Sequence, residues 1–343
     1  MTMEIDGRRV WEQATGDGDR SYAHYCLQWG VILNGPGNPG NWFEQKDISY
    51  QNVITAQKRT DLRRFSEDMQ DGDIVVLKSG QMIGEAIGVI VGDYEWRPDF
   101  GDIDGWNLQH VRRVNWLYSE REEFGEKIFK WGATTQKVIY PRIIDWINSK
   151  VTDFSRVVTL PELPKIGNFQ TDFSQVSEFL FDAGLANEAI NKLTKNMDEL
   201  TRIADWYMRK DVSVSEPETI AYLVIPFLSQ LGWTPQRMAV EWQKVDVALF
   251  GSLPRDGTNL QTIVEVKKRG RACLSALGQA ERYANKFSCD KLVVTDGIRY
   301  GVFIRENDAF VPKSYLNILD LKSAYPILKA RGAQDAILAL APD

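Results

Sequence analysis

Apolar positions in the second half of the chain follow a helical spacing before they follow a strand-like one. Residues three and four apart predict an amphipathic helix between Ser215 and Gly232. Its buried stripe consists of Ile220, Leu223, Phe227 and Leu231. Ser215 with Glu218 three residues later is typical of a capping box, and Gly232 fits the helix end.

Two short apolar runs, 245–250 and 263–266, come next and predict neighbouring strands. A helical pattern over 274–284 is followed by a hairpin over 291–304, whose turn is Asp296-Gly297. Helices and strands that alternate in this way predict an α/β core over residues 211–343.

The first half of the chain has short strand-like runs between turns rich in Gly, Pro and Asp. We expect strands within 29–33, 71–78, 82–96 and 110–117. Short strands that close on one another predict a small bent β-barrel with helices over residues 1–160. The whole chain is therefore expected to be α+β, and its length of 343 residues fits two domains.

A proline-bounded segment, Pro161-Glu162-Leu163-Pro164, marks the domain boundary, and we expect residues 161–210 to form a helical linker. Apolar residues recur there at alternating spacings of three and four, as in a heptad pattern: Ile190, Leu193, Met197, Leu200, Ala204 and Tyr207. Two interpretations remain open. The stripe packs on a helix near 173–184, or it forms the contact of a homodimer, the commonest symmetric oligomer.

Charged residues interrupt the two apolar strands of the second half. Glu265 and Lys267 are two residues apart and therefore share one strand face, and pairing of the two runs would bring Asp246 to them. An ordinary solvated strand face carries such pairs too. The flanking valines favour a buried strand, however, in which unpaired charge is costly. Two carboxylates and an ammonium there could bind a divalent metal and activate a water.

Two further polar positions belong to the same prediction. Glu216 lies four residues before Ile220, on the inward face of its helix. Glu218 already has the capping role, so Glu216 is the better candidate for the site. Gln279 and Tyr283 share one face of the next helix.

The order of these pieces resembles the PD-(D/E)xK nuclease superfamily, and within it the N-terminal nuclease domain of type I restriction subunits. The resemblance covers about residues 211–343 and rests on six segments: Glu216-Pro217-Glu218-Thr219, Pro226-Phe227-Leu228-Ser229-Gln230-Leu231-Gly232-Trp233, Val245-Asp246-Val247-Ala248-Leu249, Val264-Glu265-Val266-Lys267-Lys268, Gln279-Ala280-Glu281-Arg282-Tyr283 and Thr295-Asp296-Gly297.

This resemblance implies a role for each residue of the site. Asp246 and Glu265 would ligate Mg²⁺, or Mn²⁺ in its place, with the Val266 carbonyl as a third ligand. Lys267 would orient the attacking water or stabilise the transition state. Glu216 would support the metal, and Gln279 would position the site or contact DNA.

The strands of the first half resemble the EVE and PUA-like domains over about residues 20–160. The resemblance rests on 29–32, 72–77, 87–96 and 110–116. Relatives of this fold read modified bases by flipping one into an aromatic pocket, which needs stacking faces and hydrogen-bonding groups. The candidate base-binding residues are Trp29, Trp42, Tyr94, Trp96, Trp106, Asn34, Asn41 and Asp93. Trp29 lies in a strand-like run and is the one that core packing explains best.

Charge and composition narrow the choice of partners. The net charge of −6 argues against a general polycation, but local basic residues matter for DNA. Lys268, Arg269 and Arg271, with Arg112 and Arg113, are the expected contacts to the DNA backbone.

Scattered cysteines (Cys26, Cys273 and Cys289) and the lack of a membrane-spanning run predict a cytoplasmic protein. The sequence thus predicts a modification-dependent DNA restriction endonuclease. An RNA-directed nuclease, or a binding or sensor module with a PUA-like reader, is the alternative.

Overall fold

The computed structural model describes residues 4–16, 20–209, 214–268 and 272–342, and the chain forms two compact units, Met1–Ile166 and Gly167–Asp343. Each unit combines helices with one sheet, so the expected α+β class is confirmed. Each unit has its own hydrophobic core.

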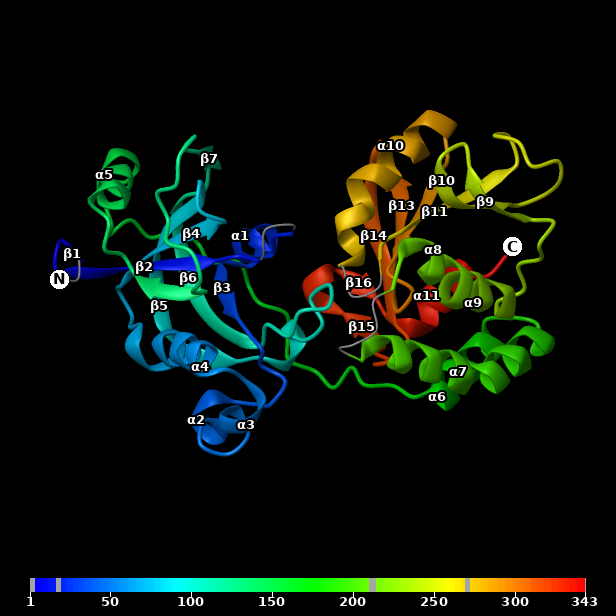
Figure 1. Ribbon diagram of the computed structural model, residues 1–343, viewed down its shortest axis with the longest axis horizontal. Helices are drawn as coiled ribbons and strands as arrows, with labels where there is room; N and C mark the ends of the chain where they lie inside the picture. The colour runs from blue at the N-terminus through cyan, green and yellow to red at the C-terminus, as the bar shows by residue number, and fades with distance from the viewer. Residues whose placement is uncertain (1–3, 17–19, 210–213, 269–271, 343) are drawn as a thin grey trace. The chain divides into compact units, whose positions relative to one another are not determined.

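The sheet of the first unit runs in the order β1-β2-β4-β5-β6-β3, with β8 beside β2 and β7 beside β5 (Figure 1). Only β2 and β4 pair in parallel among these strands. The strands are β1 (Glu4–Ile5), β2 (Arg8–Ala14), β3 (Val31–Asn34), β4 (Ile74–Ser79), β5 (Ile83–Trp96), β6 (His110–Tyr118), β7 (Glu122–Glu123) and β8 (Thr135–Lys137).

Irregular pairing shapes β5, the longest of these strands. Its pairing with β6 shifts register between Ile87 and Gly88 and again between Val91 and Tyr94. Such bulges bend a strand and increase its twist. The strands expected within 71–78, 82–96 and 110–117 are confirmed.

The strand expected within 29–33 begins later than predicted. Trp29 ends helix α1 (Ala23–Trp29), and Gly30 caps that helix at φ 58° before β3 begins. A residue without a Cβ takes this left-handed conformation at little cost, which is why the helix stops there. The remaining helices are α2 (Trp42–Gln45), α3 (Tyr50–Val53), α4 (Ala56–Arg63) with a π-helical turn over Arg64–Asp68, a 3₁₀ turn over Pro98–Phe100, and α5 (Pro141–Lys150).

The sheet of the second unit runs in the order β15-β16-β14-β13-β12-β11-β10-β9 (Figure 1). The pairs β11/β12 and β14/β16 are parallel, and the others are antiparallel. The strands are β9 (Met238–Trp242), β10 (Val245–Phe250), β11 (Leu260–Val266), β12 (Lys291–Thr295), β13 (Arg299–Glu306), β14 (Ala309–Asn317), β15 (Ala324–Tyr325) and β16 (Ala330–Arg331).

A helical crossover connects the parallel strands β11 and β12, as parallel pairing requires. It consists of a 3₁₀ turn over Cys273–Ala276 and α10 (Leu277–Phe287). The hairpin of β12 and β13 pairs Thr295 with Tyr300 around the expected Asp296-Gly297 turn. The expected order of strands and helices from 245 to 304 is therefore confirmed.

The helix expected between Ser215 and Gly232 has three parts: α8 (Glu216–Thr219), a π-helical turn over Ile220–Val224, and α9 (Ile225–Gln230). The π turn precedes Pro226, which has no N–H to donate to the preceding turn. The expected capping box is present: the Ser215 hydroxyl accepts from the Glu218 backbone N–H at 3.3 Å, and the Glu218 carboxylate accepts from the Ser215 backbone N–H at 2.9 Å.

The interpretation of residues 161–210 as a linker is corrected by the packing. Helices α6 (Phe173–Asp182) and α7 (Asn187–Met208) belong to the second unit. The entire heptad-like stripe of α7 is buried in the core of that unit, with Leu193 fully inaccessible and Leu200 2% exposed. The intramolecular interpretation is therefore the one observed, and this stripe offers no free surface for a dimer.

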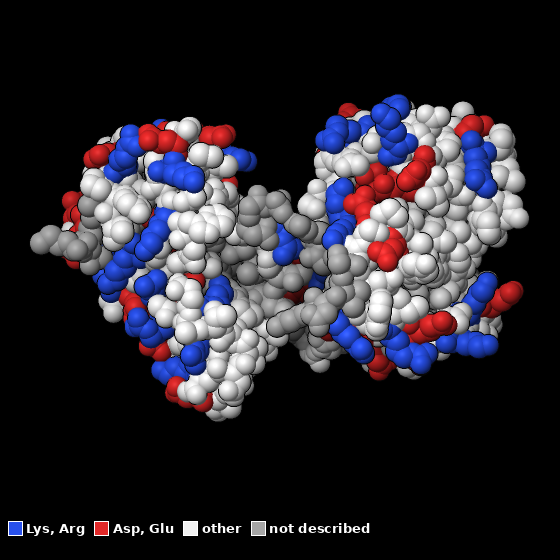
Figure 2. Space-filling model, viewed as in Figure 1, with Lys and Arg blue, Asp and Glu red and all other residues white. Residues whose placement is uncertain are grey.

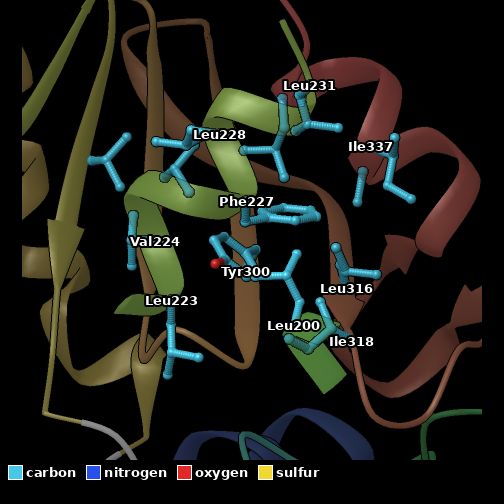
Figure 3. Packing of buried hydrophobic residues seen from close by; sticks show 14 of the residues in the cluster. Leu200, Leu223, Val224, Phe227, Leu228, Leu231, Tyr300, Leu316, Ile318 and Ile337 are labelled. Atoms are coloured by element: carbon cyan, nitrogen blue, oxygen red, sulfur yellow. The ribbon is translucent and has the colours of Figure 1, made fainter. Parts of the chain in front are cut away.

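Figure 3 shows how these helices meet the sheet. Phe227 of α9 lies against Tyr300 of β13 with ring centroids 4.7 Å apart, and Leu200 of α7 packs beside them. Helix α11 (Ala333–Leu340) contributes Ile337 to the same core. The apolar stripe expected from Ile220 to Leu231 is confirmed as buried. This packing fixes α8, and with it Glu216, against the sheet.

All three cysteines are buried, and none of them forms a disulfide bond. No helix in the described part of the chain is long and apolar enough to cross a membrane.

Candidate functional site

The pairing of β10 with β11 brings the candidate carboxylates to one end of the second sheet. Val247 lies opposite Val264, so the register carries Asp246 and Glu265 to adjacent positions, one residue further along. Residues opposite each other in an antiparallel pair project from the same face. The Asp246 carboxylate accepts from the Val266 backbone N–H at 2.7 Å, which locks the two strand ends together.

Glu265 is the most unusual residue of this end of the sheet. Its side chain is completely buried, and neither carboxylate oxygen has a hydrogen-bond partner of good geometry. Burial first and the Asp246 charge second raise the pKa of Glu265 to about 8, although the nearby Asp246 amide and Lys267 oppose the shift. A buried carboxylate without partners is costly. It therefore holds a proton or requires a cation.

Glu216 approaches the same group from α8. It is partly buried, and its pKa is raised by burial first and by the Asp246 charge second, with Lys267 acting in the opposite direction. The pKa of Asp246 is also raised by burial, against the effects of the Val266 amide and of Lys267. The structure thus brings Glu216 to the strand carboxylates, whereas Glu218 points to its capping partner.

Lys267 and Gln279 complete the group. Lys267 follows β11 and its backbone N–H donates to the Thr295 carbonyl at 2.7 Å. Its ammonium donates to the Gln279 amide oxygen at 3.3 Å. Gln279 comes from α10, so the predicted link between the strand and the following helix is present.

Figure 2 shows Asp and Glu side chains gathered on one face of the second unit, in the region of α8, β10 and β11, with Lys and Arg side chains at their border. Among the described residues, no three His, Cys, Asp or Glu side chains converge closely enough to hold a metal ion by themselves. Mg²⁺ needs only one or two carboxylates when water and substrate phosphate supply its other ligands. The unpartnered oxygens of Glu265, beside Asp246, fit that requirement.

The expected basic patch beside this group is only partly described. Lys268 is exposed, whereas Arg269 and Arg271 lie outside the described residues. The predicted DNA contact of these two residues therefore stays a prediction.

Several candidate base-binding residues of the first unit have structural roles instead. Trp42 begins α2, is 4% exposed, and its indole N–H donates to Glu67 at 2.8 Å. Trp29 is buried at the end of α1. Asn41 caps α2 by accepting from the Phe43 backbone N–H at 3.0 Å.

Trp96 lies at the end of β5, not in a loop, and its indole N–H donates to the Gly37 carbonyl at 2.9 Å. The pair Asp93 and Tyr94 lines a cavity of about 770 Å³. Exposed Phe43 lines it too and packs edge-on against Tyr94. Two of the predicted residues thus meet there.

The two predicted DNA-backbone arginines of this unit differ in how far they are available to a phosphate. Arg112 is 3% exposed, and its guanidinium donates to the backbone carbonyls of Phe65 at 2.6 Å and Met69 at 2.7 Å. Arg113 donates to the Pro161 carbonyl at 2.6 Å. The prediction for Arg112 is corrected, because its buried guanidinium already holds a neighbouring segment onto β6, whereas the DNA contact of partly buried Arg113 stays a prediction.

A second cavity, of about 400 Å³, brings Asn34 and Trp106 together. Its volume lies in the range of small-molecule sites, roughly 300–1,000 Å³. Tyr22 meets Trp106 edge-to-face at 5.1 Å, and the Arg20 guanidinium lies 3.7 Å from the centroid of the same ring. Tyr22 and Trp106 give this cavity the aromatic lining expected of a base-binding site.

Sequence reasoning missed several residues around this cavity, Tyr22 among them. Lys58 and Thr134 line it, and Thr134 also lines a neighbouring cavity of about 240 Å³ together with Trp131. Trp131 is 68% exposed. The one available sequence signal was the tryptophan itself, in the polar, glycine-containing segment 130–134.

Residues 11–141 match a family model described as Domain of unknown function (DUF8426). The match lies within the first unit and spans less than half of the chain. No curated protein matches the chain.

Proposed function

We propose that the chain is a Mg²⁺-dependent DNA endonuclease directed to its substrate by a modified base, as in a modification-dependent restriction system. The observation that carries the proposal is Glu265, a fully buried carboxylate with both oxygens unpartnered, next to Asp246 and two residues from Lys267. Stability alone does not account for such a residue, because a hydrophobic side chain would fill the position without the cost of a buried charge.

The surrounding fold supports the choice of reaction. A parallel pair, β11 and β12, is joined by α10 and flanked by antiparallel strands, and α8 supplies a further carboxylate. This arrangement agrees with the resemblance to PD-(D/E)xK nucleases, in which the acidic residues and the lysine serve phosphodiester hydrolysis.

The residues of the group would divide the chemistry among them. Asp246 and Glu265 would hold the metal ion, with the Val266 carbonyl and Glu216 in support. When bound, the metal would acidify a water and stabilise negative charge on the phosphate. The Lys267 ammonium, held by Gln279, would orient that water and donate to the developing charge. When all three carboxylates are ionised, the single Lys267 ammonium leaves the group with a net negative charge that a cation would balance.

The first unit would recognise the modified base. Its aromatic cavity around Trp106, with polar groups from Lys58 and Thr134, suits a planar ligand with a hydrogen-bonding edge. This supports the resemblance to EVE and PUA-like readers. The separate cores of the two units fit a division between reading and cutting.

Cleavage of DNA with defined base modifications tests the proposal. The purified protein should cut modified DNA when Mg²⁺ is present and leave it intact in EDTA. Glu265→Gln, Asp246→Asn and Lys267→Ala should each lower the cleavage rate by at least about a hundredfold, the usual effect of removing a group that stabilises the transition state.

Glu306→Gln is the matched control for Glu265→Gln, since it makes the same change at the exposed far end of β13. It should cut like the wild type. Full activity of Glu265→Gln would disprove the catalytic assignment. Cleavage of RNA in preference to every DNA tested would replace DNA as the substrate. A homodimer stays a prediction for double-strand cutting, tested by light scattering with and without DNA.

A further inference from the structure

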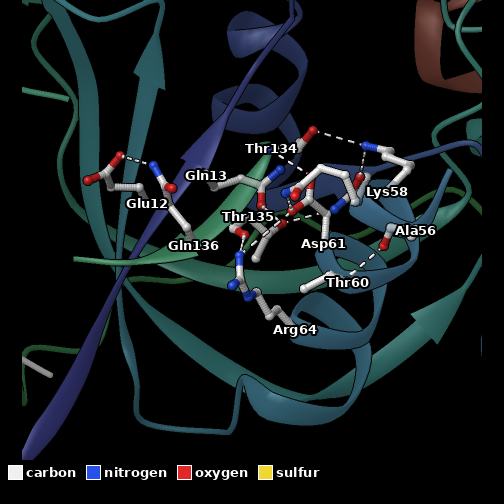
Figure 4. A network of polar contacts seen from close by, with 12 residues as sticks. Glu12, Gln13, Ala56, Lys58, Thr60, Asp61, Arg64, Thr134, Thr135 and Gln136 are labelled. Atoms are coloured by element: carbon white, nitrogen blue, oxygen red, sulfur yellow. Dashed lines mark hydrogen bonds and ion pairs between the residues drawn. The ribbon is translucent and has the colours of Figure 1, made fainter. Parts of the chain in front are cut away.

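The polar wall of the Trp106 cavity is built around one lysine. Lys58 belongs to α4, and its ammonium donates to the Asn34 amide oxygen and to the Thr134 hydroxyl oxygen, both at 2.9 Å (Figure 4). An ammonium has three N–H donors. Two are used in these bonds, so the third remains for whatever enters the cavity that Lys58 lines.

Asn34 was predicted to read the base edge, but its own hydrogen bonds leave it little capacity. It is fully buried. Its amide oxygen accepts from both Lys58 and the Gly35 backbone N–H, and its amide nitrogen donates to Thr135 at 2.9 Å. Both lone pairs of the oxygen are thereby occupied. The Asn34 oxygen therefore positions Lys58 and has no lone pair left for a ligand.

Further bonds keep this wall rigid. The Thr135 hydroxyl donates to Gln13 at 2.7 Å, and the Thr134 backbone N–H donates to the Asp61 carboxylate at 3.1 Å (Figure 4). The Thr134 hydroxyl accepts from Lys58, which leaves its own proton to donate. The wall thus presents donors, an ammonium N–H and a hydroxyl, next to the rings of Tyr22 and Trp106.

From this arrangement we infer that Lys58 is the specificity-determining residue of the cavity, and that the preferred base presents an oxygen acceptor or an anionic group to it. A base modified only by a methyl group would gain nothing from this contact. The inference rests on the proposed reader function of the first unit, and it adds the chemical class of the modification.

The charged state of Lys58 gives a second way to test the contact. Burial lowers the pKa of Lys58 to about 8, and Asp61, on the same helix, opposes the shift. His110 is the other titratable group that senses Lys58, and burial lowers its pKa to about 4. Lys58 therefore loses its proton as the pH rises through about 8, while His110 stays neutral there.

Equilibrium binding of the full chain without divalent metal, to otherwise identical duplexes, tests the inference. The duplexes contain cytosine, 5-methylcytosine, 5-hydroxymethylcytosine or 5-carboxylcytosine. The wild type should bind the oxygen-bearing duplexes about ten- to a hundredfold more tightly than the methylated one, as expected for one charged hydrogen bond. Lys58→Met should lose this difference while its affinity for the methylated duplex stays the same.

Lys58→Arg keeps a cation that does not titrate near pH 8, and it serves if the methionine variant does not fold. The wild-type preference should fall between about pH 7 and 9, and that of Lys58→Arg should not. Equal binding of the wild type to all four duplexes would overturn the modified-base reader itself. A wild-type preference that survives in Lys58→Met, or that favours the methylated base, would overturn only the role of Lys58.

Discussion

The two units place their candidate sites in different ways. In the second unit, the carboxylates and the lysine lie on consecutive strands, β10 and β11, and the register of one hairpin brings them together. In the first unit, the cavity around Trp106 is lined by residues from segments between Gly16 and Thr134. One site follows from local strand pairing, and the other needs the complete fold.

The two sites also differ in whether their buried polar groups have hydrogen-bond partners. The cavity wall of the first unit is a connected network in which Asn34, Lys58 and Thr135 each have partners. In the second unit, Glu265 is left without partners in a buried position. A satisfied network gives a rigid shape for recognition, whereas an unsatisfied carboxylate gives a strong tendency to bind a cation.

The largest effect we predict separates the stability of the two units. Leu193→Glu would bury a carboxylate in the core of the second unit, which should destabilise it by more than about 4 kcal/mol. Denaturant unfolding should show an early transition of this unit and an unchanged one for the first. Asn191→Glu, which puts the same charge on the exposed face of α7, should change the stability by less than about 0.5 kcal/mol.

A folded Leu193→Glu protein with unchanged stability would contradict the packing of α7. If light scattering then showed that the variant had lost a dimer, the stripe would be an intermolecular contact after all.

The second prediction concerns the pH dependence of the metal-free protein. The pKa of Glu265 is about 8 in the folded state against an ordinary value of 4.5, so the folded state holds a proton that the unfolded state releases. Stability should therefore fall as the pH rises from about 4.5 through about 8, by up to roughly 5 kcal/mol. The free energy of unfolding, measured by denaturant titration across this range, checks the sign and size.

Glu265→Gln should flatten this pH dependence, because the amide does not titrate. Glu306→Gln, in its exposed position, should leave the curve as it is in the wild type. Parallel curves for wild type and Glu265→Gln would mean that Glu265 is not the buried titrating group.

Sequence patterns were enough for the second site because its spacing is local. Glu265 and Lys267 are two residues apart, and the β10–β11 pairing followed from two apolar runs. Lys58 could not be found in this way, since its partners Asn34 and Thr134 are 24 and 76 residues away. Trp42 was misassigned because a tryptophan next to glycines and prolines resembles a loop residue, whereas Tyr50 and Leu62 bury it.

The third prediction asks which cavity of the first unit meets DNA. If exposed Trp131 stacks on a base, Trp131→Ala should weaken binding to modified DNA by about 1–3 kcal/mol without loss of stability. Phe43→Ala is the matched change, because Phe43 is 54% exposed and lines the other cavity. Fluorescence anisotropy without divalent metal measures both. A loss of affinity in Phe43→Ala alone would move the reader site to the cavity of Asp93 and Tyr94.

The smallest predicted effect tests whether Glu216 and Glu218 of α8 have different roles, Glu216 in the site and Glu218 in the helix cap. Ser215→Ala removes the hydroxyl that caps this helix, and should lower the stability of the second unit by about 1 kcal/mol. Cleavage should continue, because Glu216 and the strands remain. Glu216→Gln should do the opposite: it should slow cleavage and leave the stability nearly unchanged, since Glu216 faces Asp246 while Glu218 holds the cap. Thermal unfolding and cleavage rates, measured on both variants, decide between the two roles. If Glu216→Gln cuts at the wild-type rate, α8 contributes only packing to the site, and Asp246, Glu265 and Lys267 act without it.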